Sequence, residues 1–118
     1  GRTTVNAVLG TVLSFFIMDF MVYSRYMTDI VTTITPILQE AGVTKAALFG
    51  SFARGEQTTT SDVDILIEFG GNKNLFDLIE LKDDLKTALH RNVDVVTYNS
   101  LHPLLRDRII NEQQPIYG

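Results

Sequence analysis

The spacing of apolar side chains predicts that the chain alternates between helices and strands. Between Asp29 and Ala41, apolar residues recur every three or four positions, which is the spacing of one face of a helix. Thr28 or Asp29 is expected to cap this helix and Gly42 to end it. Pro36 lies within the segment, and we expect it to bend the helix or to make it restart.

Three short apolar segments are predicted to form strands, at Lys45–Phe49, Asp62–Phe69 and Val93–Thr97. In the second segment apolar and polar residues alternate, which is typical of a half-buried strand. Its apolar face consists of Val63, Ile65, Ile67 and Phe69. The polar segment Ser51–Thr60 is predicted to be a loop or a single helical turn, and Ile116–Tyr117 a short terminal strand.

Two further helices complete the predicted fold. Asn74–His90 shows the clearest helical pattern, and we expect its apolar stripe to lie in the core. The stripe consists of Leu75, Leu78, Ile79, Leu85 and Leu89. A last helix is expected to begin with Ser100 as its cap and Pro103 in its first turn. This order of elements predicts an α+β domain, a small mixed β-sheet with helices packed on it.

The first 26 residues have a different character from the rest of the chain. Val5–Tyr23 is an apolar run just long enough to span a bilayer, but Asp19 within it would cost about 3 kcal/mol there. Met27 begins a segment typical of the start of a protein. We therefore predict an N-terminal extension over 1–26 and a domain over 27–118. An extra helix packed on the domain or on a dimer mate, and a membrane segment, are the alternatives.

Composition and charge narrow the possible functions. The 118 residues are enough for one small domain. A formal net charge of −4 argues against a broad nucleic-acid footprint, so no direct nucleic-acid binding is expected. With no cysteine, disulfides and thiolate zinc sites are excluded, and we predict a cytoplasmic protein. His90 and His102 are expected to be surface or capping residues rather than metal ligands.

A Gly-Ser pair and a pair of aspartates carry the first chemical signals. Gly50-Ser51 follows a predicted strand, where a glycine permits close approach of a ligand and free backbone N–H groups suit a phosphate. Asp62 and Asp64 lie two positions apart on one strand, so their carboxylates share a face. Like charges held this close favour a cation between them, and oxygen ligands suit Mg²⁺. The structural alternative for Gly50-Ser51 is an ordinary turn. For Asp62 and Asp64 it is a solvated acidic edge of the strand.

A third aspartate, Asp94, lies in the middle of a predicted strand between apolar neighbours. A carboxylate there is costly unless it is paired or faces a site. If its strand lies beside the Asp62–Asp64 strand, the three carboxylates could meet and hold two metal ions roughly 4 Å apart, as in phosphoryl transfer. An exposed edge-strand residue is the alternative.

Taken together, these residues resemble a known signature. Leu48-Phe49-Gly50-Ser51-Phe52-Ala53-Arg54-Gly55, followed by Ser61-Asp62-Val63-Asp64-Ile65, is similar to the motif of the DNA polymerase β-type nucleotidyltransferases, and in particular to their minimal prokaryotic branch. The resemblance covers about residues 27–118, and Asp94 fits the position of the third carboxylate. It implies a palm-like fold, and transfer of a nucleoside monophosphate from ATP with two Mg²⁺ ions.

The resemblance also implies a role for each site residue. Gly50 and Ser51 would hold the terminal phosphates, and Asp62 and Asp64 would ligate both Mg²⁺ ions. Asp94 would help to bind the catalytic metal and would orient or deprotonate the acceptor hydroxyl. Arg54 would either contact phosphate or pair with Glu56 or Asp62. Arg106 and Arg108 are expected to lie on a solvated helix face, with a patch facing a partner or phosphate as the alternative.

The acceptor is a separate question from the chemistry. Minimal relatives often act as antitoxins that attach AMP to a tyrosine of a HEPN-type toxin, and this is the function that the resemblance implies. The alternatives are a small-molecule nucleotidyltransferase of the aminoglycoside type that needs a partner chain, and an antitoxin that binds its toxin without catalysis. The base preference and the oligomeric state, including a homo-oligomer, stay open.

Overall fold

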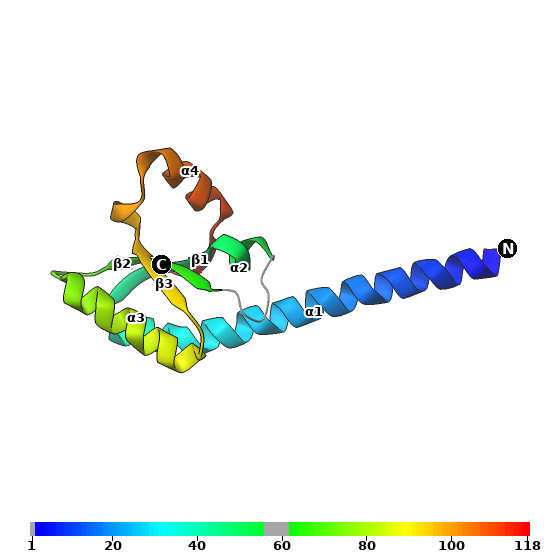
Figure 1. The fold of residues 1–118 in the computed structure, drawn as a ribbon, viewed down its shortest axis with the longest axis horizontal. Coiled ribbons are helices and arrows are strands. Elements are labelled where there is room, and N and C mark those ends of the chain that lie inside the picture. The colour runs from blue at the N-terminus through cyan, green and yellow to red at the C-terminus, as the bar shows by residue number, and fades with distance from the viewer. Residues whose placement is uncertain (1, 56–61) are drawn as a thin grey trace.

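A long helix, α1 (Arg2–Glu40), leads into a four-stranded sheet that carries three further α-helices (Figure 1). The structure is a computed structural model that describes residues 2–55 and 62–118, with residues 2–20 and Phe52 described by their backbone alone. The elements after α1 are β1 (Val43–Phe49), α2 (Gly50–Arg54), β2 (Val63–Phe69), α3 (Leu75–Leu89), β3 (Val93–Thr97), the 3₁₀ helix η1 (Tyr98–Ser100), α4 (Pro103–Glu112) and β4 (Gln114–Tyr117). The predicted α+β class and mixed sheet are confirmed.

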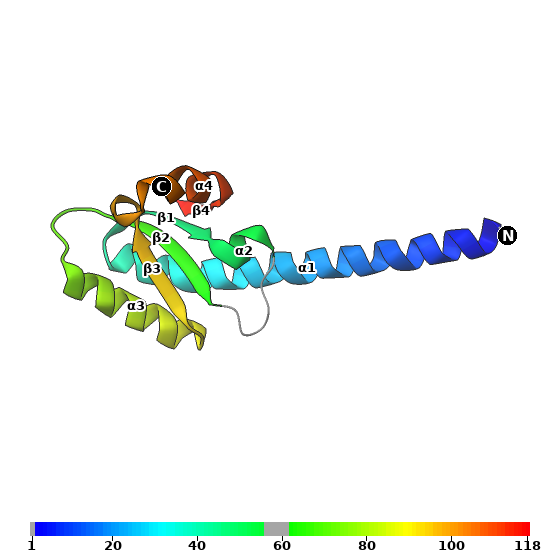
Figure 2. The same ribbon diagram turned by 45° about the horizontal axis from the view of Figure 1, so that its top comes forward.

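The sheet has the strand order β3-β2-β1-β4. β1 pairs antiparallel with β2 and with β4, whereas β2 and β3 run parallel. Two layers of helices cover it: α1 and α3 lie on one face, and α4 lies on the other (Figure 2). The sheet therefore holds the ends of β1, β2 and β3 in fixed relative positions, which decides where the predicted site residues lie.

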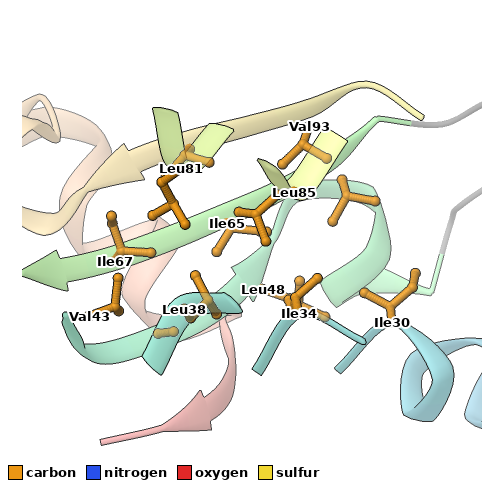
Figure 3. Packing of buried hydrophobic residues seen from close by; sticks show 13 residues of the cluster. Ile30, Ile34, Leu38, Val43, Leu48, Ile65, Ile67, Leu81, Leu85 and Val93 are labelled. Carbon is orange, nitrogen blue, oxygen red and sulfur yellow. The ribbon is translucent and has the colours of Figure 1, made fainter. Parts of the chain in front are cut away.

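The main core lies between the sheet and the helices α1 and α3. Ile34 and Leu38 of α1 and Leu85 of α3 are fully buried, and Ile65 and Ile67 of β2 point into the same cluster (Figure 3). The alternation predicted for β2 is confirmed, because Val63, Ile65 and Ile67 belong to this cluster. A smaller cluster on the other face joins Leu66, Ala47 and Tyr98 to apolar residues of α4.

The first helix begins earlier than the pattern predicts. The Thr28 hydroxyl donates to the Ser24 carbonyl at 2.9 Å, and the Thr33 hydroxyl donates to the Asp29 carbonyl at 2.8 Å. Thr28 and Asp29 are therefore residues of the helix interior, and the predicted cap at either residue is wrong. Pro36 lies inside α1 without ending it.

The predicted boundary at 26/27 does not coincide with an end of α1, which runs without a break from Arg2 to Glu40. Among the residues of α1 whose side chains the structure describes, 21–40, the first buried one is Ile30, and Met27 packs against the core. In both views the N-terminal part of α1 extends away from the sheet (Figures 1 and 2). No helix in the described part of the chain combines the length and apolar character needed to cross a membrane.

α3 lies where the sequence predicts a helix, at Asn74–His90, but a different face of it is buried. Asn74 caps α3, because its side chain accepts from the Asp77 N–H at 3.1 Å while the Asp77 side chain accepts from the Asn74 N–H. Leu81 and Leu85 are buried, whereas Leu75 and Ile79 are 67 % and 54 % exposed. The prediction that these last two belong to the core is wrong. Ile79 lies two positions before the buried Leu81, about 200° around the helix, and therefore points to nearly the opposite side.

The last helix is capped by a different residue from the one predicted. His102 Nδ1 accepts from the Leu104 N–H at 3.1 Å, and Pro103 occupies the first turn. The Ser100 hydroxyl instead donates to the Thr97 carbonyl at 2.9 Å, so the predicted Ser100 cap is wrong. His90 ends α3 with a φ of 54°. Both histidines are therefore capping residues, as predicted, and β4 confirms a terminal strand.

Candidate active site

The two strands β2 and β3 bring two of the predicted carboxylates together. In their parallel register, Asp64 is the Cα partner of Asp94, and the flanking pairs are Val63 with Val93 and Ile65 with Val95. Asp94 is exposed and Asp64 is half-buried, while Asp62 lies exposed just before β2. The adjacency on which the predicted three-carboxylate site depends is therefore present for Asp64 and Asp94.

The electrostatics of Asp64 are unusual for an aspartate. Its pKa is raised from 3.8 to about 6, mainly because the carboxyl group is removed from water and in part because of the negative charges of Asp94 and Asp62. The positive charge of Arg54 acts in the opposite direction and lowers this pKa. The carboxyl group thus lies in an environment with an excess of negative charge, which a bound cation would relieve.

Gly50 lies directly against the Asp64 carboxylate. Its neighbour Phe49 is the Cα partner of Asp64 across β1 and β2, and Gly50 itself has a φ of 71°. A Cβ at Gly50 would collide with the Oδ2 atom of Asp64. Only glycine combines this backbone conformation with such a close approach. Ser51, the second residue of the predicted phosphate-binding pair, follows at once in α2 and is half-buried.

Arg54 has a partner that the sequence did not indicate. Its Nη1 atom lies 3.7 Å from Oε2 of Glu112 in α4, and the Nε atom of Arg108 lies 3.3 Å from Oε1 of the same carboxylate. The sequence predicted Glu56 or Asp62 as an alternative partner of Arg54. Glu56 lies outside the described residues, and the acid in this ion pair is Glu112 rather than Asp62. The phosphate contact of Arg54 stays a prediction.

A cavity of about 210 Å³ lies beside Gly50, between α2 and α4. It is lined by Phe49, Gly50, Arg54, Leu105, Arg108, Ile109 and Glu112. The sequence contained only one signal for the contribution of α4, the helical i,i+4 spacing of Arg108 and Glu112, and that spacing does not say that the pair faces Arg54.

The described carboxylates do not by themselves enclose a metal ion. Within residues 2–55 and 62–118, no group of three or more His, Asp and Glu side chains has the arrangement of a metal site. Asp64 and Asp94 nevertheless offer adjacent oxygen ligands, and Mg²⁺ commonly takes one or two carboxylates and completes its coordination with phosphates and water. The donors therefore fit an ion that arrives with a nucleotide better than a cage made of protein alone.

Comparison with known proteins identifies the family. The family model described as polymerase beta, nucleotidyltransferase matches residues 32–118. The chain is 56 % identical, over 86 residues, to a provisionally named protein adenylyltransferase of Methanocaldococcus jannaschii, a match that covers 73 % of this chain and 92 % of that protein. It is 38 % identical over 71 residues to the protein adenylyltransferase MntA of Thermococcus cleftensis, covering 60 % of this chain and 72 % of the relative.

A solved structure agrees with these relatives. A chain in the crystal structure of a toxin–antitoxin complex with AMP-PNP has a TM-score of 0.67 and 26 % identity to this protein, and the match covers 75 % of this chain and 73 % of that one. The family match extends from α1 to the C-terminal residue and includes Gly50, Asp64 and Asp94. This chain belongs to the polymerase β-type nucleotidyltransferase family.

Proposed function

We propose that this protein transfers AMP from ATP to a hydroxyl group of a partner protein, with Mg²⁺ as cofactor. The observation that carries the proposal is the register of β2 and β3, which sets Asp64 opposite Asp94, next to Gly50 of the pair predicted to bind phosphate. The names of the relatives support protein as the acceptor, because both are called protein adenylyltransferases. We also propose that the protein works in the cytoplasm, where ATP is abundant.

The proposed partner is a HEPN-type toxin, and the proposed acceptor is a tyrosine hydroxyl on it. The sequence resemblance to minimal nucleotidyltransferases implies this partner. The similar structure of a toxin–antitoxin complex with AMP-PNP supports a toxin partner and an ATP-like nucleotide. In this proposal the chain is an antitoxin that acts by modifying the toxin.

The site residues divide the chemistry between them. Asp62 and Asp64 would bind two Mg²⁺ ions together with the phosphates, and Asp94 would help to bind the catalytic ion. Mg²⁺, when bound, supplies positive charge against the negative charge that develops on the phosphoryl oxygens. Gly50 and Ser51 would bind the terminal phosphates, which fixes the α-phosphorus in front of the acceptor. Most of the rate enhancement would then come from positioning and charge stabilisation.

The reaction is a single displacement in line. The acceptor oxygen attacks the α-phosphorus and forms a new P–O bond. The bond between the α-phosphorus and the oxygen that bridges it to the β-phosphate breaks. Asp94 would orient the hydroxyl or accept its proton. Pyrophosphate leaves, and AMP stays on the partner as a phosphodiester.

Co-expression with the toxin tests this proposal in cells. Wild-type protein should protect the cells, and the toxin recovered from them should be heavier by one or more AMP groups. The variant Asp62→Asn/Asp64→Asn should lose both effects while it still co-purifies with the toxin. If the variant protects as well as wild type, the antitoxin acts by contact alone. If the toxin stays unmodified while a small-molecule acceptor is labelled, the aminoglycoside-type alternative is favoured.

A further inference from the structure

The cavity beside Gly50 is lined by two arginines that share one carboxylate. Arg54 comes from α2, and Arg108 and Glu112 come from α4, which packs against α2. Gly50 also lies against Asp64, so the cavity and the carboxylate site adjoin through this one residue. A molecule with one group at Asp64 and a chain of further groups beyond Gly50 would extend into the cavity.

We propose that Arg108 of α4 joins Arg54, whose phosphate contact is already predicted, in binding the terminal phosphates of the nucleoside triphosphate, and that Glu112 holds both guanidinium groups when no nucleotide is bound. This inference rests on the proposed function and names a part of the same site. It adds Arg108 and Glu112, which lie far along the chain from the Gly50-Ser51 and Asp62–Asp64 motifs.

The charges around the cavity fit a phosphate chain. One carboxylate shared by two guanidinium groups leaves a net positive charge, and the planar fork of arginine matches the oxygen pairs of a phosphate. A triphosphate carries several negative charges, so it can draw both arginines away from a single carboxylate. An AMP molecule has no β- or γ-phosphate to place there.

The ion pairs are weak enough to exchange. The side chains of Arg54 and Glu112 are 39 % and 34 % exposed, and that of Arg108 is 70 % exposed. Exposed ion pairs contribute little to stability, because water screens them and ordering the side chains costs entropy. Glu112 therefore keeps the arginines at the cavity without binding them tightly.

A purely structural role makes a different prediction. None of the described residues of α4 is fully buried, so Glu112 could serve only to tie α4 to α2. In that case, loss of Arg108 would lower the melting temperature and weaken every nucleotide to the same extent. A phosphate subsite would instead weaken ATP selectively, and the fold would be retained.

Calorimetric titration of ATP and of AMP, each with Mg²⁺, separates the two roles. We expect Arg108→Gln to weaken ATP binding about tenfold and to leave AMP binding unchanged. The matched control is Arg106→Gln, because Arg106 lies on the same helix but lines a different cavity with Lys45 and Tyr98. That variant should bind both nucleotides as wild type does. Arg108→Lys, which keeps the charge without the fork, should lie in between.

Glu112→Gln gives a second, independent readout. It keeps both arginines and removes the competing carboxylate, so we expect ATP affinity to rise several-fold while AMP affinity stays constant. The inference is overturned if Arg108→Gln binds ATP like Arg106→Gln, if it weakens ATP and AMP equally, or if Glu112→Gln weakens ATP. The two proposals can fail separately. If the protein labels no partner but Arg108→Gln still weakens ATP binding alone, the proposed function is rejected and this inference is retained.

Discussion

Asp64 and Asp94 stand opposite each other on the neighbouring parallel strands β2 and β3, although the whole of α3 separates them in the chain. The parallel pairing requires a crossover, and α3 provides it by packing Leu81 and Leu85 onto the sheet. The same crossover that completes the core thus creates the pair of acids. Substitution of an acid and substitution of a core residue of α3 should therefore have different effects on stability.

Substitution of Asp64 should stabilise the metal-free protein near neutral pH. The pKa of Asp64 rises from 3.8 to about 6 on folding, so between these values the folded state binds more protons than the unfolded state. Stability therefore falls as pH rises from about 4 to about 6, and the penalty persists above pH 6. Asp64→Asn removes it, and we expect a gain of about 1 kcal/mol at pH 7.5, after allowance for solvent screening of this half-buried group.

Urea unfolding in the presence of EDTA measures this gain. The difference between Asp64→Asn and wild type should be largest above pH 6 and should disappear below pH 4, where both side chains are neutral. An asparagine variant that is equally destabilised at every pH would show that the Asp64 carboxylate is not under electrostatic strain.

Gly50→Ala should abolish activity by moving the Asp64 carboxylate. The new Cβ would collide with Oδ2 of Asp64, and the left-handed backbone adds about 1–2 kcal/mol of strain. Gly71→Ala is a matched control, because Gly71 has a φ of 81° with no atom within 4 Å of the added Cβ. Both variants should lose similar stability from the backbone alone, but only Gly50→Ala should slow AMP transfer, by about 100-fold or more. Equal rates for the two variants would contradict the proposed role of Gly50.

Much of this site could be predicted from sequence because its signals are local. The motif containing Gly50 and Asp64 lies in adjacent elements, and the alternation in β2 shows which side chains share a face. The ion pair between Arg54 and Glu112 could not be predicted in this way, because it depends on how α4 packs against α2. The start of α1 could not be predicted in this way either, because a threonine hydroxyl such as that of Thr28 can bond to the backbone both at a helix cap and inside a helix.

The error over α3 has a simple geometrical origin. Helical spacing places Leu75 and Ile79 within a broad apolar stripe, but α1 and the sheet cover only a narrow line that includes Leu81 and Leu85. Which part of a broad stripe is covered depends on the angle between helix and sheet, and local periodicity does not contain that angle.

The two kinds of α3 residue should differ sharply in their effect on stability. Leu85→Ala removes a fully buried side chain and should cost about 2–5 kcal/mol of unfolding free energy. Ile79→Ala, at a position that is 54 % exposed, should cost less than about 1 kcal/mol. Denaturant titration of both variants measures the two losses of unfolding free energy. Equal losses would show that Ile79 belongs to the core as much as Leu85 does.

Chelation should stop the reaction without unfolding the protein. The carboxylates at Asp64 and Asp94 need a cation to bind a triphosphate, because they repel its phosphates otherwise. We expect EDTA to abolish AMP transfer, excess Mg²⁺ to restore it, and the circular dichroism of the helices to stay constant throughout. Transfer that continues at full rate in EDTA would rule out the proposed metal-dependent chemistry.

We have proposed that Asp62, Asp64 and Asp94 serve a transfer of AMP to protein. The most direct test is incubation of the purified protein and the proposed toxin partner with α-labelled ATP and Mg²⁺, in parallel with the Asp62→Asn/Asp64→Asn variant. We expect label on the toxin with wild-type protein and none with the variant, although both bind the toxin. Absence of label on the toxin with wild-type protein, while the two proteins still form a complex, would show that the three aspartates do not serve this transfer.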